Sequence, residues 1–186
     1  MEVLLKRRSV RMFDPNFNIP REDLEKIMTV AQNYPCSYGR QEVDFVVCTN
    51  KELLQNLSDQ LHKNIPEFTE YLDNRISELH VKQTIWCDAT CVVFLVSNKT
   101  KNFHADSKEM NMGEAGMSII AAAEALGYNT LPVLMPANPA ASEFTAKALN
   151  IPKEDLGLSI ALGKALPEWK DHIQEKEIKS NVKYIE

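Results

Sequence analysis

The sequence predicts an α+β fold, in which helices pack against a small β-sheet. Apolar side chains recur at positions i, i+3, i+4 and i+7 between residues 24 and 31, which is the spacing of an amphipathic helix. Mainly apolar runs at 91–96 and 156–163 are typical of buried strands. The 186 residues, 44% of them hydrophobic, suit one compact domain over 1–186.

Charge and composition exclude several classes of protein. A net charge of -5 argues against a nucleic-acid binder, which would present a broad basic face. No apolar run approaches the length of a membrane span and no signal peptide is visible, so we expect a cytoplasmic protein with no membrane partner. The four cysteines form no Cys-x-x-Cys pair and have no histidine at zinc-like spacing, so we expect free thiols and no metal site.

The first half of the chain alternates between helix and strand. A helix is predicted to begin at residues 19–23, with Pro20 at the first helical position and acidic side chains in the first turn, and to end before Pro35. A strand follows at 45–48. Residues 51–84 are mainly helical by their apolar spacing, with a break at Pro66, and we expect them to cover one face of the sheet.

The second half begins with the buried strand at 91–96. A helix over 111–127 is rich in small residues and stops at Gly127. A strand then ends near 132–136, and an amphipathic helix over 138–150 should turn Phe144, Ala148 and Leu149 inward. The strand at 156–163 and a short alternating strand at 182–185 complete the chain.

A basic cluster near the N-terminus points to a bound anion. Arg7, Arg8, Ser9 and Arg11 place three guanidiniums and a hydroxyl within five residues of an acidic chain. Guanidiniums suit phosphate oxygens, and in a helix Arg7 and Arg11 would share one face. The alternative interpretation is a solvated basic turn or a set of internal salt bridges.

A small polar loop connects the first helix to the first strand. By composition it is only a connection, although its hydroxyl and amide groups could also reach a ligand. Five of its residues are candidates for ligand binding: Pro35, Cys36, Ser37, Gly39 and Gln41.

Taken together, these segments resemble the FMN-dependent nitroreductase family. The resemblance rests on the Arg-Arg-Ser-x-Arg opening, on Pro35, Ser37 and Gln41 before a Phe-Val-Val strand, and on the small-residue helix that ends Leu-Gly. It implies a three-layer sandwich with a mixed or antiparallel sheet of four to five strands and an exchanged C-terminal arm. It also implies a homodimer with one FMN in each of two interfacial sites.

The resemblance assigns roles to four groups of residues. The basic cluster would hold the phosphate, ribityl chain and pyrimidine edge of FMN, and the polar loop would meet the flavin edge. In that loop Cys36 replaces a Ser, Gly39 an Asn, and residues 42–43 a Pro-Trp pair. The arm would bring Lys176, or alternatively Lys179, to the phosphate. The strand end, formed by Pro132, Val133, Leu134 and Met135, would cross the flavin face. Backbone N–H groups near Leu134 and Met135 would then face the flavin N5 atom.

The implied activity is a ping-pong oxidoreduction. NAD(P)H would reduce FMN, and a small acceptor such as a nitroaromatic or a quinone would then take the electrons, with no catalytic side chain required. The alternatives are an FMN storage or sensor protein without turnover, or other flavin chemistry such as dehalogenation or flavin breakdown. The polar stretch 98–110, with His104 and several lysines, is typical of a solvated loop, and the resemblance places a lid there.

Overall fold

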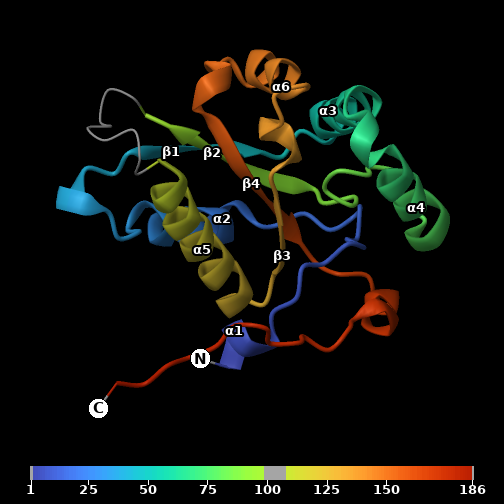
Figure 1. Ribbon diagram of the computed structural model, residues 1–186. Helices are drawn as coiled ribbons and strands as arrows, with labels where there is room; N and C mark the ends of the chain where they lie inside the picture. Colours follow the sequence, from blue (N-terminus) through green and yellow to red (C-terminus); the bar gives the residue numbers. More distant parts are fainter. Residues whose placement is uncertain (1, 99–107, 186) are drawn as a thin grey trace.

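The protein folds around a four-stranded antiparallel sheet. Its structure is a computed structural model that describes residues 2–98 and 108–185, apart from the side chain of Ser37. The strand order is β1-β2-β4-β3, and each neighbouring pair is antiparallel (Figure 1). These strands are β1 (Val43–Cys48), β2 (Cys91–Ser97), β3 (Asn129–Val133) and β4 (Leu156–Gly163).

The sheet is buried on both faces, which gives the predicted three layers. Every residue of β2 is buried, and its side chains alternate between two apolar clusters. Val92 and Phe94 belong to the cluster that contains the third helix, α3 (Lys51–Asn64). Val93 and Leu95 belong to the cluster under the second and fifth helices, α2 (Arg21–Gln32) and α5 (Lys108–Ala125).

Helix α2 begins one residue later than predicted. Pro20 is the N-cap and not the first helical residue, and Arg21 opens the helix. The predicted apolar stripe is buried at Leu24, Ile27 and Ala31. The one-residue difference is small, because a proline suits the start of a helix in either position.

The small residues of α5 allow it to lie close to the sheet. A Cβ on Gly116 would lie 2.7 Å from Cδ2 of Leu158, and one on Gly157 would overlap the sulfur of Met112. The helix therefore packs tightly against β4, as an alanine-rich core helix should.

The face predicted for the helix at 138–150 was wrong at Phe144 and Ala148, whereas Leu149 packs against the apolar cluster that contains α3. Helix α6 spans Ser142–Leu149, and its buried residues are Ser142, Thr145 and Ala146. Phe144 is 45% exposed and Ala148 is exposed as well. The helix packs onto α3 and two short 3₁₀ turns, η4 (Met135–Ala137) and η5 (Lys153–Asp155), through its small side chains.

The remaining elements are short and lie toward the ends of the molecule. They are α1 (Glu2–Lys6), η1 (Ser37–Gly39), η2 (Pro66–Phe68), α4 (Thr69–Leu79) and η6 (Pro167–His172). Beyond η6 the chain is exposed and forms no strand within the described part of this single chain, so the strand predicted at 182–185 is not formed here. No helix among the described residues is long and apolar enough to cross a membrane.

Candidate functional site

The arginine-bearing segment is extended and lies along the edge of the sheet. Helix α1 ends at Lys6, and Ser9 forms a parallel bridge with Thr130 of β3. The backbone N–H of Val10 donates to the carbonyl of Thr130 at 3.1 Å, and that of Phe13 to the carbonyl of Cys87 at 3.1 Å. Arg7 and Arg11 therefore do not share a helix face, because burial of Val10 and Phe13 holds this segment extended.

Phe13 anchors this segment against β4. Its side chain is fully buried, and a Cβ on Gly163 would lie only 2.9 Å from Cδ1 of Phe13. Such a contact is shorter than real Cβ atoms tolerate, so the glycine makes room for the aromatic ring. The last residue of β4 thus positions the segment that carries the arginines.

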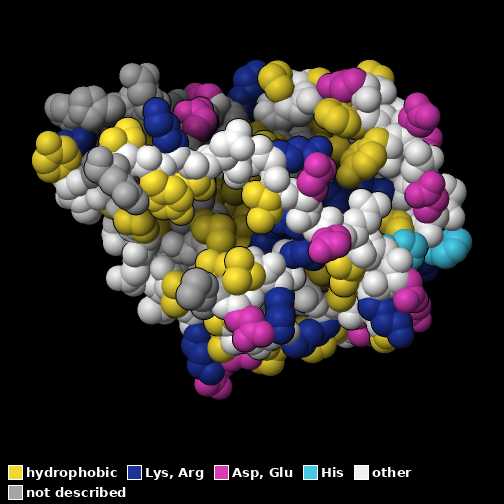
Figure 2. Space-filling model, turned by 60° about the horizontal axis from the view of Figure 1, so that its bottom comes forward, with side chains coloured by type: hydrophobic (Ala, Val, Ile, Leu, Met, Phe, Trp, Pro, Cys, Tyr) yellow, Lys and Arg dark blue, Asp and Glu magenta, His cyan; other side chains and the backbone are white. Residues whose placement is uncertain are grey.

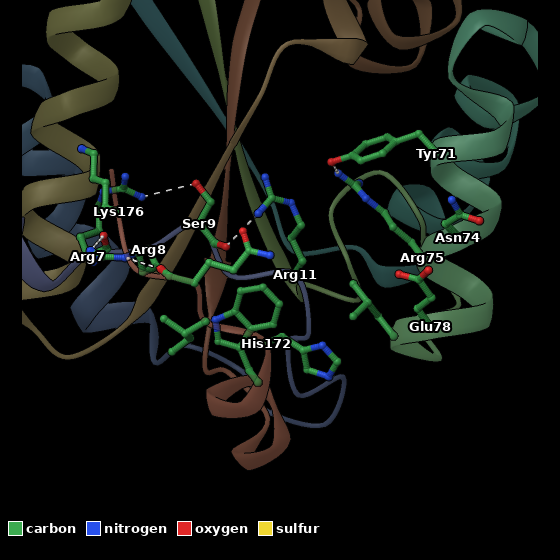
Figure 3. A pocket seen from close by; sticks show the side chains of 14 residues that line it. Arg7, Arg8, Ser9, Arg11, Tyr71, Asn74, Arg75, Glu78, His172 and Lys176 are labelled. Carbon is green, nitrogen blue, oxygen red and sulfur yellow. Dashed lines mark hydrogen bonds between the residues drawn. The ribbon is translucent and has the colours of Figure 1, made fainter. Parts of the chain in front are cut away.

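The basic residues line a cavity of 580 Å³, which we call the arginine cavity. Its walls come from the N-terminal segment, from α4, and from η6 with the chain that follows it (Figure 3). Figure 2 shows Lys and Arg side chains gathered around the hollow on this face. The polar residues used below are Arg7, Arg8, Ser9, Arg11, Arg75 and Lys176.

Among the described residues, the guanidiniums in this cavity form no salt bridge. Arg8 donates to the carbonyls of Leu5 and Arg7 at 3.1 and 2.9 Å, and Arg11 donates to the carbonyl of Ser9 at 3.3 Å. Within the described ranges, no carboxylate lies within 4.0 Å of these guanidiniums or that of Arg75. The Nε atom of Arg11 is buried and has no hydrogen-bond partner in the described part of the chain. Such an uncompensated cluster favours an anionic ligand.

A second cavity, of 510 Å³, adjoins the first at the end of β3, and we call it the β3 cavity. Arg11, Tyr71 and Arg75 line both cavities. The predicted strand-end residues Pro132, Val133, Leu134 and Met135 all line the β3 cavity. Its wall is mainly apolar, and β3 is an edge strand, where a proline without an N–H is tolerated.

Two residues of this site, Tyr71 and Arg75, come from α4 and were missed by the sequence analysis. Arg75 donates to the carbonyls of Thr84 and Ile85 at 2.5 and 3.3 Å, and to the hydroxyl of Tyr71 at 2.8 Å. Burial acts to raise the pKa of Tyr71, but the hydrogen bonds and positive charges of Arg75 and Arg11 outweigh it and lower the pKa. The sequence did contain a sign that Arg75 is buried, because it follows Leu72 by three residues and so lies on the apolar face of the helix.

The polar loop after α2 does not reach either cavity. In Figure 1 it lies beside β1, on the side of the molecule away from α4. The backbone N–H of Gln41 donates to the sulfur of Cys36 at 3.2 Å, and the Gln41 side chain donates to the carbonyl of Gln32 at 2.9 Å. Pro35 and Gly39 line neither cavity, and the side chain of Ser37 lies outside the described structure. One chain therefore does not bring this loop to the arginines.

The late lysines can be told apart by position. Lys176 lines the arginine cavity, whereas Lys179 pairs with Glu177 at 3.1 Å on the surface. His104 and most of the polar stretch 98–110 lie outside the described residues. All four cysteines are free, and the described residues contain no cluster of His, Cys, Asp or Glu that could hold a metal ion.

The two cavities together suit one ligand with an anionic end and a flat apolar body. The arginine cavity offers cationic donors for the anionic group. The β3 cavity offers a mainly apolar wall that includes Leu134, a residue that is 69% exposed. Arg11 stands at the junction and can contact both parts.

The sequence matches one protein family along most of its length. The sequence model described as "Nitroreductase family" matches residues 4–164. The chain is similar to an "Oxygen-insensitive NADPH nitroreductase" of Helicobacter acinonychis, with 35% identity over 63 residues. That match covers 34% of this chain and only 30% of the curated relative's length.

Solved structures share the fold. A nitroreductase with bound FMN from Bacteroides fragilis superposes with a TM-score of 0.76 at 18% identity, covering 100% of this chain and 97% of that chain. A nitroreductase with bound FMN from Desulfitobacterium hafniense gives a TM-score of 0.71 at 26% identity, covering 95% and 97% of the two chains. These likenesses support the α+β sandwich predicted from the sequence.

Proposed function

The chain belongs to the nitroreductase family, and from this premise we propose that it is an FMN-dependent oxidoreductase that transfers electrons from NAD(P)H to a small organic acceptor. The observation that carries the proposal is the pair of joined cavities, one lined by guanidiniums that form no salt bridge within the described residues and the other by the end of β3. FMN has the matching shape, because a phosphate and a flat ring system are joined by a flexible chain. Both structural relatives described above carry FMN by their names.

The residues present fit this cofactor. A phosphate group carries a charge of about -1.5 to -2 at neutral pH and would offset the uncompensated arginines. Arg7, Arg8, Ser9 and Lys176 would hold the phosphate and ribityl chain, and Arg11 would meet the pyrimidine edge of the ring. The ring would then lie against residues 132–135, where backbone N–H groups can stabilise negative charge without any particular side chain.

The reaction we propose is ping-pong. When bound, FMN supplies the hydride chemistry, and the protein binds, orients and shields it. NAD(P)H is the donor, in keeping with the NADPH in the name of the Helicobacter relative. The acceptor is a nitroaromatic or a quinone, which would enter the β3 cavity after the donor leaves.

We further propose that the working form is a cytoplasmic homodimer of single-domain subunits. Within one chain the polar loop at 35–41 does not reach the cavities, so a second subunit would have to bring it there. The C-terminal arm exposes Ile178, Val182, Tyr184 and Ile185, an apolar set that a partner's surface would cover. The four free cysteines suit a reducing compartment.

The test is the colour of the purified protein and its response to a donor. A yellow protein that bleaches with NADPH or NADH without oxygen, and regains its colour when a quinone is added, has the proposed activity. A yellow protein that neither nucleotide bleaches would favour the alternative of an FMN storage or sensor protein. A protein that does not retain FMN would refute the proposal altogether.

A further inference from the structure

Tyr71 carries a hydroxyl whose two charged neighbours can only donate hydrogen bonds to it. Nη2 of Arg75 donates to Oη of Tyr71 at 2.8 Å, and Arg11 faces the same hydroxyl from the N-terminal segment (Figure 3). A guanidinium has five donors and no acceptor. None of the described residues accepts the hydrogen of this hydroxyl. The O–H bond of Tyr71 is therefore left to donate into the cavity.

Arg75 lines both cavities, but most of its donors are engaged by protein groups. Its side chain is 7% exposed, and Nη1 is engaged by the carbonyls of Thr84 and Ile85. Its Nε is buried and has no hydrogen-bond partner among the described residues. These contacts attach α4 to the turn at 84–85 and hold the phenol in place. Through Tyr71 the pair offers the cavity a hydroxyl donor that Arg75 holds in place.

The hydroxyl lies where an acceptor would bind. Tyr71 lines the β3 cavity together with Leu134 and Met135, the residues proposed to face the reactive edge of the flavin. Phe68 and Ala137 supply apolar surface in the same cavity. A small aromatic acceptor in this space would therefore have the flavin on one side and a phenol donor nearby.

We propose that Tyr71 is the proton donor to the acceptor, that Arg75 is its positioning residue, and that the acceptors are compounds, such as quinones, whose reduction places a proton on oxygen. This inference rests on the proposed function. In the step, a hydride from the reduced cofactor adds to one quinone oxygen, and the proton on Oη of Tyr71 passes to the other. The product is the hydroquinone, the phenolate left at Tyr71 lies beside Arg75 and Arg11, and solvent returns the proton.

The electrostatics of the site agree with this role. The pKa of Tyr71 is lowered although burial acts to raise it, because Arg75 and Arg11 stabilise the phenolate. The adjoining arginine cavity is lined by further charged or ionisable groups: Arg7 and Arg8 of the N-terminal segment, Glu78 of α4, and His172 and Lys176 near the C-terminus. A phenol made more acidic by fixed cations is a better proton donor.

The first experiment separates the two halves of the reaction in Tyr71→Phe. We expect unchanged FMN affinity and unchanged reduction by NADPH. Oxidation of the reduced enzyme by benzoquinone should slow by roughly 10²-fold or more, the effect of removing a general acid. Ferricyanide takes electrons without a proton, so its rate with the variant should equal that of the wild type.

A second experiment keeps the fold intact and reports on the phenol directly. Replacing Tyr71 with 3-fluorotyrosine retains the hydroxyl and its contact with Arg75, and ¹⁹F NMR of the cofactor-free protein follows its ionisation. We expect the midpoint to lie below that of free 3-fluorotyrosine. We also expect the alkaline decline of the benzoquinone rate to move to lower pH than in the wild type, a shift that a purely structural role would not cause.

The outcomes are distinct. A Tyr71→Phe enzyme that benzoquinone oxidises at the wild-type rate overturns the inference, as does one that loses FMN affinity, since the hydroxyl would then serve the cofactor. A ¹⁹F midpoint equal to that of free 3-fluorotyrosine also overturns it. If the wild type itself does not bind FMN or is not reduced by a nucleotide, the proposed function has failed, and not this assignment.

Discussion

Substituting Arg11 by alanine tests whether the arginine cavity binds FMN. Arg11 donates to the carbonyl of Ser9 at 3.3 Å and faces the hydroxyl of Tyr71, and within the described residues it has no carboxylate within 4.0 Å. Its worth to the folded protein is therefore small, about 1 kcal/mol or less. Its contribution to the binding free energy of FMN should be that of a hydrogen bond from a charged group, about 1.5–3 kcal/mol. The dissociation constant for FMN should rise by roughly 10- to 150-fold.

In the assay, the cofactor-free protein is titrated with FMN, and binding is measured by the quenching of flavin fluorescence. The free energy of unfolding of the same samples is measured by urea titration. Arg7→Ala should behave in the same way. Arg21→Ala is the matched control, because its side chain is 84% exposed and pairs only with Glu25, one helical turn away. The reasoning would be refuted if both cavity variants bound FMN as tightly as Arg21→Ala. It would also be refuted if the affinity fell only in proportion to unfolding.

Three further predictions address the dimer, the loop and the pH dependence of stability. Removing the chain after Lys179 should abolish the dimer and FMN binding together, measured by light scattering and absorbance, and a stable yellow monomer would contradict the shared site. Cys36→Ser should keep FMN and reductase activity, because a hydroxyl can also accept the hydrogen bond that Gln41 donates at 3.2 Å; a tenfold loss with FMN still bound would make the thiol catalytic. Tyr128 donates to Asp23 at 2.5 Å and lowers the pKa of that carboxyl. The stabilisation of the folded protein by this contact is therefore complete above the pKa of Asp23 in the unfolded chain, and it is lost as the pH falls through the lower pKa of Asp23 in the folded protein. The difference in unfolding free energy between the wild type and Asp23→Asn should therefore shrink below about pH 4 in urea titrations, and a constant difference would exclude this contribution.

The sequence by itself determined the elements whose signals are local. Mainly apolar runs predicted the strands now seen at Cys91–Ser97 and Leu156–Gly163, because a strand buried on both faces is apolar at most positions. Helix spacing likewise predicted α2 to within a residue of its start. The basic cluster was visible because three arginines within five residues are unusual in an acidic chain.

Only the tertiary structure decided what those elements enclose. Arg11 meets Tyr71 and Arg75 across sixty positions of sequence, and no local pattern encodes such a contact. Phe144 was expected inside and is exposed, because neighbouring surfaces and not helix spacing select the buried face. The loop at 35–41 has the composition of a ligand-binding loop, yet the fold holds it away from the arginines. The periodicity of apolar residues predicts the secondary structure of each segment and that it has a buried face. The position of one segment against another is set by the packing of the whole chain.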